Sequence, residues 1–189
     1  MLAAGTVVLG TVSLATGNKW SQSVNTIVSD AIPSINVIYR MQLTVKDIRS
    51  EMLNPIAADS PQEMASAEGR IEALGNQFRQ QLFEYEKFIS DAQYRTLYEG
   101  HMPAYRQVQQ AWLPLRELSV ANRTEECFQI FRSQIRPLRW LEKRLSDHVE
   151  MNLKRSDAAA AAVLSNVEMS RVGTLAALIL SLLAGGLFA

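Results

Sequence analysis

Four segments of the chain carry apolar residues at alternating spacings of three and four, and this pattern constrains the fold more than any other feature. Residues at this spacing lie on one face of an α-helix, where they can pack against neighbouring helices. In the first stripe only Ser34 is polar. That stripe comprises Val24, Ile27, Ala31, Ser34, Ile38, Met41, Val45, Ile48 and Met52.

Three further stripes follow along the chain. The second comprises Met64, Ala67, Ile71, Leu74, Phe78, Leu82, Tyr85 and Ile89. The third comprises Tyr94, Leu97, His101, Ala104, Val108, Ala111, Leu115 and Leu118. The fourth comprises Phe128, Phe131, Ile135, Leu138, Leu141, Leu145 and Val149. A half-buried strand would show a period of two instead, so the chain is predicted to be all-α.

The connections between the stripes are short and contain signals for the start of a helix. Ser60 is a natural N-cap, because a proline follows it at the first helical position. Ser90 or Asp91 is expected to cap the third helix, and Asn122 or Thr124 the fourth. Short connections make consecutive helices antiparallel neighbours. The sequence therefore predicts an antiparallel up-down-up-down four-helix bundle with long first and fourth helices.

Both ends of the chain lack charge, since the first charged residue is Lys19 and the last is Arg171. The uncharged segment 172–189 has 18 residues, about the minimum for a membrane-spanning helix. Segment 1–17 is shorter and more polar, and we expect the remaining half of a first membrane helix, with a signal peptide as the alternative. The bundle domain is then predicted at 18–171, between two segments that continue its long helices into the membrane.

Composition argues against catalysis and against nucleic acid as a partner. The net charge is +0, which gives no basic surface for nucleic acid. The single cysteine, Cys127, excludes a multi-cysteine metal site and is expected to be a buried structural thiol. The two histidines, His101 and His148, form no Glu-x-x-His pair, and His101 is expected to be a hydrogen-bonded core residue. We therefore predict no enzyme activity, no catalytic residue, no metal site and no cofactor.

Arginines are the one unusual chemical feature of the sequence. Arg40 and Arg49 are nine residues apart, which puts them on roughly opposite sides of one helix. Arg132, Arg136 and Arg139 have a spacing that places them on one face, and no acidic residue lies between them. In this topology the end of the first helix lies beside the start of the fourth, so both groups gather at one end of the bundle. Unpaired arginines there favour the capture of carboxylates, with a solvated surface as the alternative.

A second strip of the first helix lies opposite its core stripe. It consists of Ile32, Asn36, Tyr39 and Leu43, again at helical spacing. A second apolar strip on a helix that already has a core face usually has another partner. We therefore expect a homodimer through this strip, with scattered surface apolar residues as the alternative.

Taken together, these features resemble the four-helix-bundle periplasmic sensor domain of bacterial methyl-accepting chemotaxis receptors. The likeness covers nearly the whole chain, from part of a first membrane helix to a second one. Within that family the chain is similar to the aspartate receptor of enteric bacteria, whose first helix carries outer arginines nine residues apart around Asn-Leu-Ser. Here Arg40 and Arg49 enclose Gln42, Leu43 and Thr44.

The resemblance implies a ligand site shared by two protomers, one offering the first arginine of the pair and the other offering the second. It also implies contacts from polar residues at the start of the fourth helix, where Gln129 and Gln134 are the nearest matches. The predicted ligand-binding residues are Arg40, Thr44, Lys46, Arg49, Tyr98, Gln129, Arg132, Gln134, Arg136 and Arg139.

The resemblance further implies signalling without chemistry. A small carboxylate or amino acid would bind at the distal dimer interface and shift the fourth helix along the membrane normal. The protein would be a homodimer in the bacterial inner membrane, with its bundle in the periplasm. A cytoplasmic signalling module would follow and act with a chemotaxis kinase and a coupling protein. The alternatives are the sensor of a histidine kinase or diguanylate cyclase, and a membrane-tethered structural bundle without a ligand.

Overall fold

The computed structural model describes residues 17–18, 20–22, 24–55, 58, 60–121 and 123–186. Within these ranges the chain is helical and contains no strand. By its internal contacts the chain divides into two compact units. One is Ser34–Asn152, and the other combines Met1–Pro33 with Leu153–Ala189.

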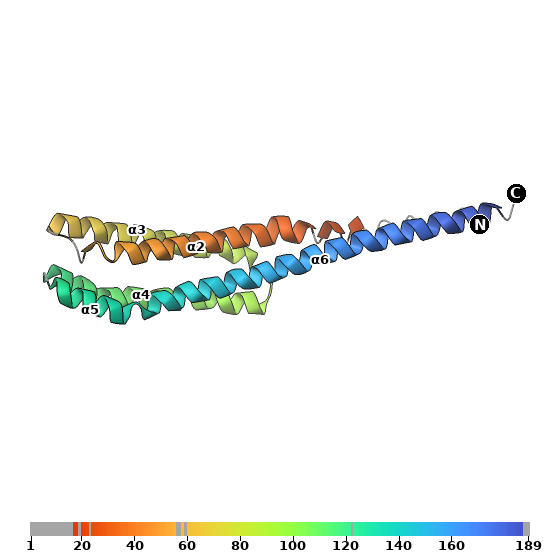
Figure 1. The fold of residues 1–189 in the computed structure, drawn as a ribbon. Helices are drawn as coiled ribbons and strands as arrows, with labels where there is room; N and C mark the ends of the chain where they lie inside the picture. Colours follow the sequence, from red (N-terminus) through yellow and green to blue (C-terminus); the bar gives the residue numbers. More distant parts are fainter. Residues whose placement is uncertain are drawn as a thin grey trace. The chain divides into compact units, whose positions relative to one another are not determined.

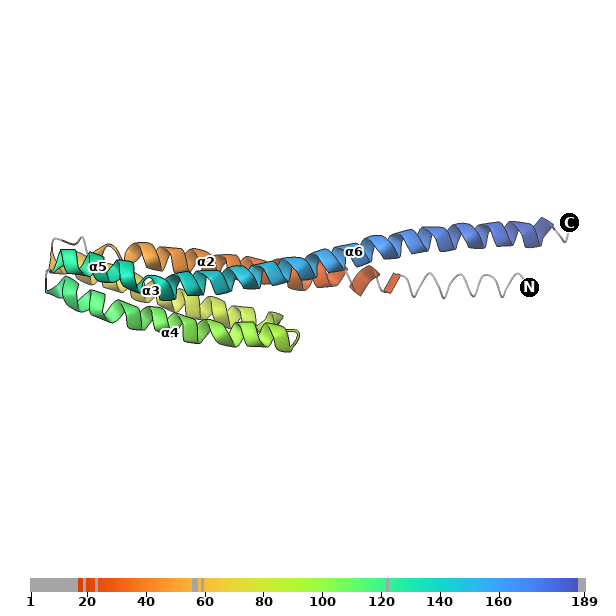
Figure 2. The same ribbon diagram turned by 60° about the horizontal axis from the view of Figure 1, so that its bottom comes forward.

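The unit Ser34–Asn152 is an antiparallel bundle of four helical rods (Figures 1 and 2). The rods are α2 (Ile32–Glu51), α3 (Pro61–Tyr85), α4 (Ala92–Val120), and a fourth made of α5 (Thr124–Gln134) and the start of α6 (Arg136–Gly186). A 3-10 turn, η3 (Glu86–Phe88), follows α3. Successive rods run in opposite directions, as the order of colours in Figure 1 shows. The predicted four-helix bundle is therefore confirmed.

Two of the three predicted helix starts are found. The Ser60 side chain accepts a hydrogen bond from the Glu63 backbone N–H at the start of α3. The carboxylate of Asp91 accepts from two backbone N–H groups at the start of α4. The third prediction fails, because the residue before α5 is Arg123, which makes no side-chain cap, and Thr124 already lies in the helix. The other candidate, Asn122, lies outside the described residues.

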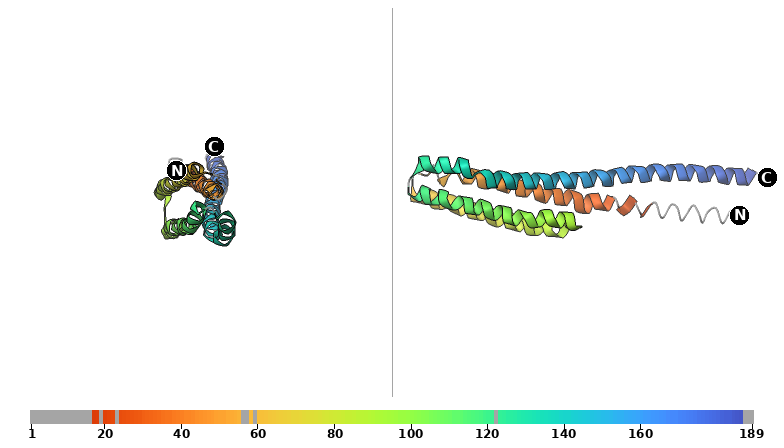
Figure 3. Two further views of the ribbon diagram at one scale, coloured as in Figure 1. Left: turned by 90° about the vertical axis from the view of Figure 1, so that its left-hand side faces the viewer. Right: turned by 90° about the horizontal axis from the view of Figure 1, so that it is seen from below.

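The predicted stripes form the core of the bundle, with the rods arranged around a common interior in the end-on view of Figure 3. The core residues are Val37, Ile38, Met41, Val45, Ile48, Met52, Phe78, Leu82, Tyr85, Phe88, Ala104, Tyr105, Val108, Leu115, Cys127, Phe131, Leu138, Leu141, Leu145 and Val149. Phe128 departs from the prediction, since it is 39% exposed while Cys127 is fully buried. Spacings of three and four fit either residue, so the sequence alone does not fix which one faces inward. The buried thiol predicted for Cys127 is confirmed.

The fourth rod is interrupted at Ile135, between α5 and α6. The cause is Pro137, which has no N–H to donate to the carbonyl of Ser133 and whose ring crowds that carbonyl. The stripe alone predicts a single helix from the start of the fourth rod onward, and this prediction is wrong at the junction. From Arg136 the helix is continuous to Gly186.

The second unit contains a π-helical segment, η1 (Thr26–Ala31), in the chain leading into α2. The Ile32 N–H bonds the Ile27 carbonyl, five residues back. Pro33 explains the wider turn, because it cannot supply the next bond of a regular α-helix. Within this unit Asp30 and Arg155 form an ion pair with an O–N distance of 2.5 Å.

The membrane helices predicted at both ends are not supported by the described residues. No helix among them is long and apolar enough to cross a membrane. Residues 187–189 of the predicted second span lie outside the described residues. Residues 1–16, which make up nearly all of the predicted first span, lie outside the described residues.

Candidate functional site

Two of the predicted arginines already have carboxylate partners within the chain. Arg40 on α2 pairs with Glu84 on α3 at 2.8 Å. Arg49 on α2 pairs with Glu142 on α6 at 3.5 Å. All four side chains are partly exposed, so each pair is weak, of the order of 0–1 kcal/mol. An anion could therefore compete with either glutamate for its arginine.

The other three predicted arginines are more accessible to a ligand than Arg40 and Arg49. Arg132 lies on α5, and Arg136 and Arg139 lie at the start of α6, all exposed. None of the three forms an ion pair with another described residue. The interruption at Ile135 stands between the first and the other two, so the three do not share one uninterrupted helical face as predicted.

The structure brings Arg49 and Arg139 to the same level of the bundle. Glu142 forms the ion pair with Arg49, and Arg139 lies three residues before Glu142 on α6, a spacing that makes neighbours on a helix surface. Arg40 lies farther along α2, against α3 rather than α6. Within the chain Arg40 is therefore separate from Arg49 and Arg139.

The remaining predicted residues have different surroundings. Thr44 is buried, and its hydroxyl lies 3.0 Å from both the Arg40 carbonyl and Gln81 Oε1. Tyr98 is half-buried and stacks on Tyr85. Lys46 and Gln129 are exposed, the latter 3.5 Å from Glu125 Oε1. The side chain of Gln134 lies outside the described residues.

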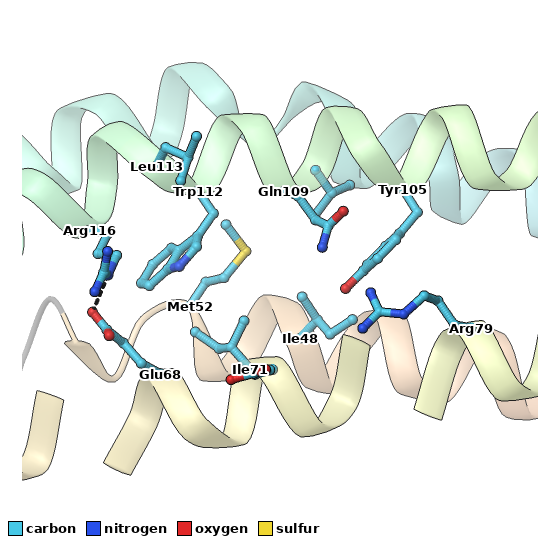
Figure 4. Close-up of a pocket in the computed structure, with 12 residues that line it drawn as sticks. Ile48, Met52, Glu68, Ile71, Arg79, Tyr105, Gln109, Trp112, Leu113 and Arg116 are labelled. Carbon is cyan, nitrogen blue, oxygen red and sulfur yellow. Dashed lines mark hydrogen bonds and ion pairs between the residues drawn. The ribbon is translucent and has the colours of Figure 1, made fainter. Parts of the chain in front are cut away.

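A groove of about 340 Å³ lies between α3 and α4 and reaches down to α2 (Figure 4). At one end Glu68 and Arg116 form an ion pair at 2.7 Å, and at the other end Tyr105 and Arg79 face each other. Its volume is near the lower limit for sites that hold small organic ligands. The lining residues are Ile48, Met52, Glu68, Ile71, Glu72, Arg79, Tyr105, Val108, Gln109, Trp112, Leu113 and Arg116. Helical spacing does not encode the distance between two helices, so no pattern in the sequence predicts this groove.

A chain of hydrogen bonds between buried polar residues crosses the bundle interior. Ser34 Oγ donates to Asn152 Oδ1 at 3.0 Å, and Asn152 Nδ2 lies 3.3 Å from Tyr85 Oη. Tyr85 Oη is 2.7 Å from His148 Nε2. His148 Nδ1 is 2.7 Å from His101 Nε2. Each of these five residues is at most 1% exposed.

The electrostatic surroundings of the two imidazoles favour their neutral forms. Burial, His148 and Arg144 together lower the pKa of His101 to about 3. Burial and Arg144 lower the pKa of His148 to about 4. The Arg144 guanidinium occupies the space above Gly100, where any Cβ would overlap it. His101 Nδ1 and Arg144 Nε are buried and have no hydrogen-bond partner among the described residues.

The prediction of a hydrogen-bonded core histidine at His101 is confirmed, but its partner was missed. His148 lies three residues after Leu145 and therefore fits the fourth stripe as well as Val149 does. Both histidines could have been assigned to core positions on that basis. Their contact depends on the level at which α4 meets α6, which a single stripe does not specify.

The described residues provide no centre for catalysis by a metal. No group of three or more His, Cys, Asp or Glu residues lies close enough to hold an ion within the described part of the chain. The two histidines bond each other and a tyrosine, so neither activates a nucleophile.

Most of the chain matches a known protein family. Residues 1–166 match the four-helix-bundle sensory module for signal transduction. No curated protein matches the chain, so the closer similarity to the enteric aspartate receptor has no support. The family's role is sensory rather than catalytic, which agrees with the prediction of no enzyme activity. The chain belongs to the family of four-helix-bundle sensory modules for signal transduction.

Proposed function

We propose that this module senses a small anionic ligand, an organic acid or an amino acid, through the arginines near the start of α6. The observation that carries the proposal is that Arg132, Arg136 and Arg139 are exposed and make no ion pair with a described residue. Arg49 lies at the level of Arg139 and is held only by a weak pair with Glu142. Guanidinium groups bind carboxylates with two parallel hydrogen bonds, which gives both affinity and orientation.

The proposed site lies at the interface of a homodimer. The second apolar strip of α2 supports this arrangement, because Ile32, Tyr39 and Leu43 are 54%, 46% and 58% exposed. Large apolar side chains in a row on one helix are a favourable surface for a second copy of the chain. A two-fold axis along this strip would bring Arg40 of one protomer toward the other protomer's cations.

Ligand binding is proposed to act through α6. An anion that takes Arg49 from Glu142 would change a contact between α2 and α6. A ligand shifts the balance between two packings only by its difference in affinity for them, and a changed inter-helix contact supplies such a difference. Between Leu138 and Val172 α6 contains no proline and no glycine, so this part of the helix is suited to carry a displacement, since sharp bends occur mainly at Pro, at Gly/Ser pairs or at π-bulges.

We place the module in a bacterial chemotaxis receptor, with the bundle in the periplasm and a kinase-coupled signalling module beyond it. The family match to a sensory module for signal transduction and the resemblance in sequence pattern support this placement. The sensors of histidine kinases and diguanylate cyclases share the bundle and are the nearest alternatives.

A structural bundle without a ligand is the second candidate function. The ion pairs Arg40–Glu84 and Arg49–Glu142 favour it, because they satisfy two of the predicted ligand-binding cations inside the protomer.

A thermal-shift screen of the purified chain decides between the two. The panel would contain succinate, citrate, benzoate and L-aspartate. A ligand at 100 times its Kd should add about 2.7 kcal/mol to the free energy of unfolding. The shift should be lost in Arg136→Ala and kept in Arg106→Ala, an exposed arginine of α4. Failure of every compound to stabilise the chain, or equal shifts in both variants, would contradict the anion site.

A further inference from the structure

The histidine pair in the bundle core has no part in the arginine site and is built differently from an ordinary core contact. His101 on α4 and His148 on α6 face each other at an N–N distance of 2.7 Å and are fully buried. We propose that this pair is a proton-binding site through which the module also senses acidification, with the proton acting as the ligand.

The pair is connected to every rod of the bundle. Ser34 belongs to α2, Tyr85 to α3, His101 to α4, and His148 and Asn152 to α6. A change in the proton state of one imidazole therefore acts on a series of hydrogen bonds whose members lie on all four rods. Buried polar groups that lose a partner cost free energy, so the packing must respond.

When both imidazoles are neutral, donation in one direction along this series of hydrogen bonds satisfies most of its polar groups. Asn152 Nδ2–H donates to Tyr85 Oη, Tyr85 O–H to His148 Nε2, and His148 Nδ1–H to His101 Nε2. A neutral imidazole has one donor and one acceptor nitrogen, and this direction uses both nitrogens of His148. His101 Nδ1 then carries the remaining hydrogen and has no acceptor.

One added proton is incompatible with that arrangement. An imidazolium donates from both nitrogens, so a charged His148 keeps its Nδ1–H bond to His101 Nε2 and also carries a hydrogen on Nε2. This second hydrogen points at Tyr85 Oη, which already receives Asn152 Nδ2–H. The Tyr85 O–H therefore loses His148 as its acceptor, and the hydrogen bond between Tyr85 and His148 is reversed. A second proton would set two N–H groups against each other across the 2.7 Å contact.

The groups around the pair oppose the positive charge. Tyr85 of α3 contacts His148 edge-on, Tyr94 of α4 lies with its ring centroid 6.0 Å from that of His148, and α2 contributes only the neutral Ser34 through Asn152. Arg144 of α6 is the charged group that disfavours protonation of both imidazoles. No carboxylate contributes to the pKa of either one. A proton taken up here therefore drives α4 and α6 apart rather than tightening a salt bridge.

The linkage between proton binding and stability determines how the closed packing responds to pH. Both folded-state pKa values lie below the ordinary 6.5, at about 3 and about 4. The closed packing is then fully stable above pH 6.5 and loses stability as the pH falls from 6.5 toward 4. If a histidine regains its ordinary pKa in an opened packing, proton uptake by His148 alone favours that packing by about 20-fold at pH 5 relative to pH 7.

Nuclear magnetic resonance of the full chain can test this directly, because the protein has only two histidines. Histidine ring signals would be followed from pH 7.5 to 4, together with amide signals of α4 and α6 and the helical circular dichroism. We expect the rings to titrate below pH 6 together with a reversible change confined to helices around the pair, while the overall helix content stays constant. Two results would overturn the proposal. One is titration near pH 6.5 without a structural change, and the other is neutrality of both rings until the whole bundle unfolds.

Arg144→Gln is the most informative variant, with Arg106→Gln, an exposed arginine outside the proposed ligand site, as its control. Removing the Arg144 charge should raise the pH at which the rings titrate and shift the opening transition by the same amount, whereas the control should leave both unchanged. Equal titration curves in the two variants would contradict the assignment. Tyr85→Phe keeps the ring and removes the hydroxyl, so it should shift the transition even if a histidine substitution fails to fold.

Discussion

At the residue scale, two glycines of α3 occupy opposite environments on the same helix. Gly75 is buried under Tyr105, whose hydroxyl fills the space where a Cβ would be. Tyr105 stacks on Phe78 with ring centroids 4.8 Å apart, so the ring has little freedom to withdraw. Gly69 is exposed, and a Cβ added to it would meet no atom within 4 Å. Gly75 therefore serves packing, whereas Gly69 only weakens the helix.

This contrast gives a paired prediction. Gly69→Ala should stabilise the chain by up to about 1 kcal/mol, because alanine is the better helix former. Gly75→Ala should lack this gain and destabilise by about 1–3 kcal/mol through overpacking against Tyr105. Urea unfolding followed by circular dichroism measures both. Equal stabilisation by the two substitutions would show that Tyr105 does not fill the site above Gly75.

The sequence predicted the environment of single residues well where a local rule applies. Ser60 and Asp91 are caps and His101 is buried, and these follow from position relative to a stripe or a turn, whereas the burial of Cys127 follows from the apolar character of a lone thiol. Partners across the bundle were not predictable in the same way. The pairing of Arg49 with Glu142 depends on the axial register of two helices far apart in sequence.

At the element scale, prolines decide where the two long rods depart from regular α-helix. Pro33 accompanies the π-helical segment before α2, and Pro137 accompanies the interruption between α5 and α6. By contrast α4 continues through Pro103 and Pro114. The sequence located the prolines, but whether a helix ends, widens or continues at each one is determined by packing of the neighbouring turns.

Pro137→Ala should therefore join α5 to α6. We expect higher helix content and a gain in stability of up to about 3 kcal/mol, the difference between proline and alanine inside a helix. Pro61→Ala is the matched control, because Pro61 stands at the first helical position of α3, where proline is favourable. Circular dichroism and urea unfolding would measure both. A loss of stability in Pro137→Ala would mean that the interruption is required by the packing of the fourth rod.

At the scale of the whole molecule, the stripes were sufficient to predict the bundle, and the family match agrees with it. The candidate sites were less predictable. The arginines could be found from their spacing and charge. The groove between α3 and α4 depends on the separation of two helices, which no pattern in the sequence predicts. The groove and the arginines are thus two candidate sites for a small molecule, and the proposed function depends on the ligand binding at the arginines.

Hydrogen–deuterium exchange of the purified full chain tests most directly whether the arginines bind the ligand. Exchange would be compared with and without the panel compound that gives the largest thermal shift. We expect slower exchange in 40–49 of α2 and in 132–142 across the junction of α5 and α6, with no change along the groove. Protection confined to the groove segments 68–79 and 105–116 would contradict the arginine site and assign the ligand to the groove between α3 and α4.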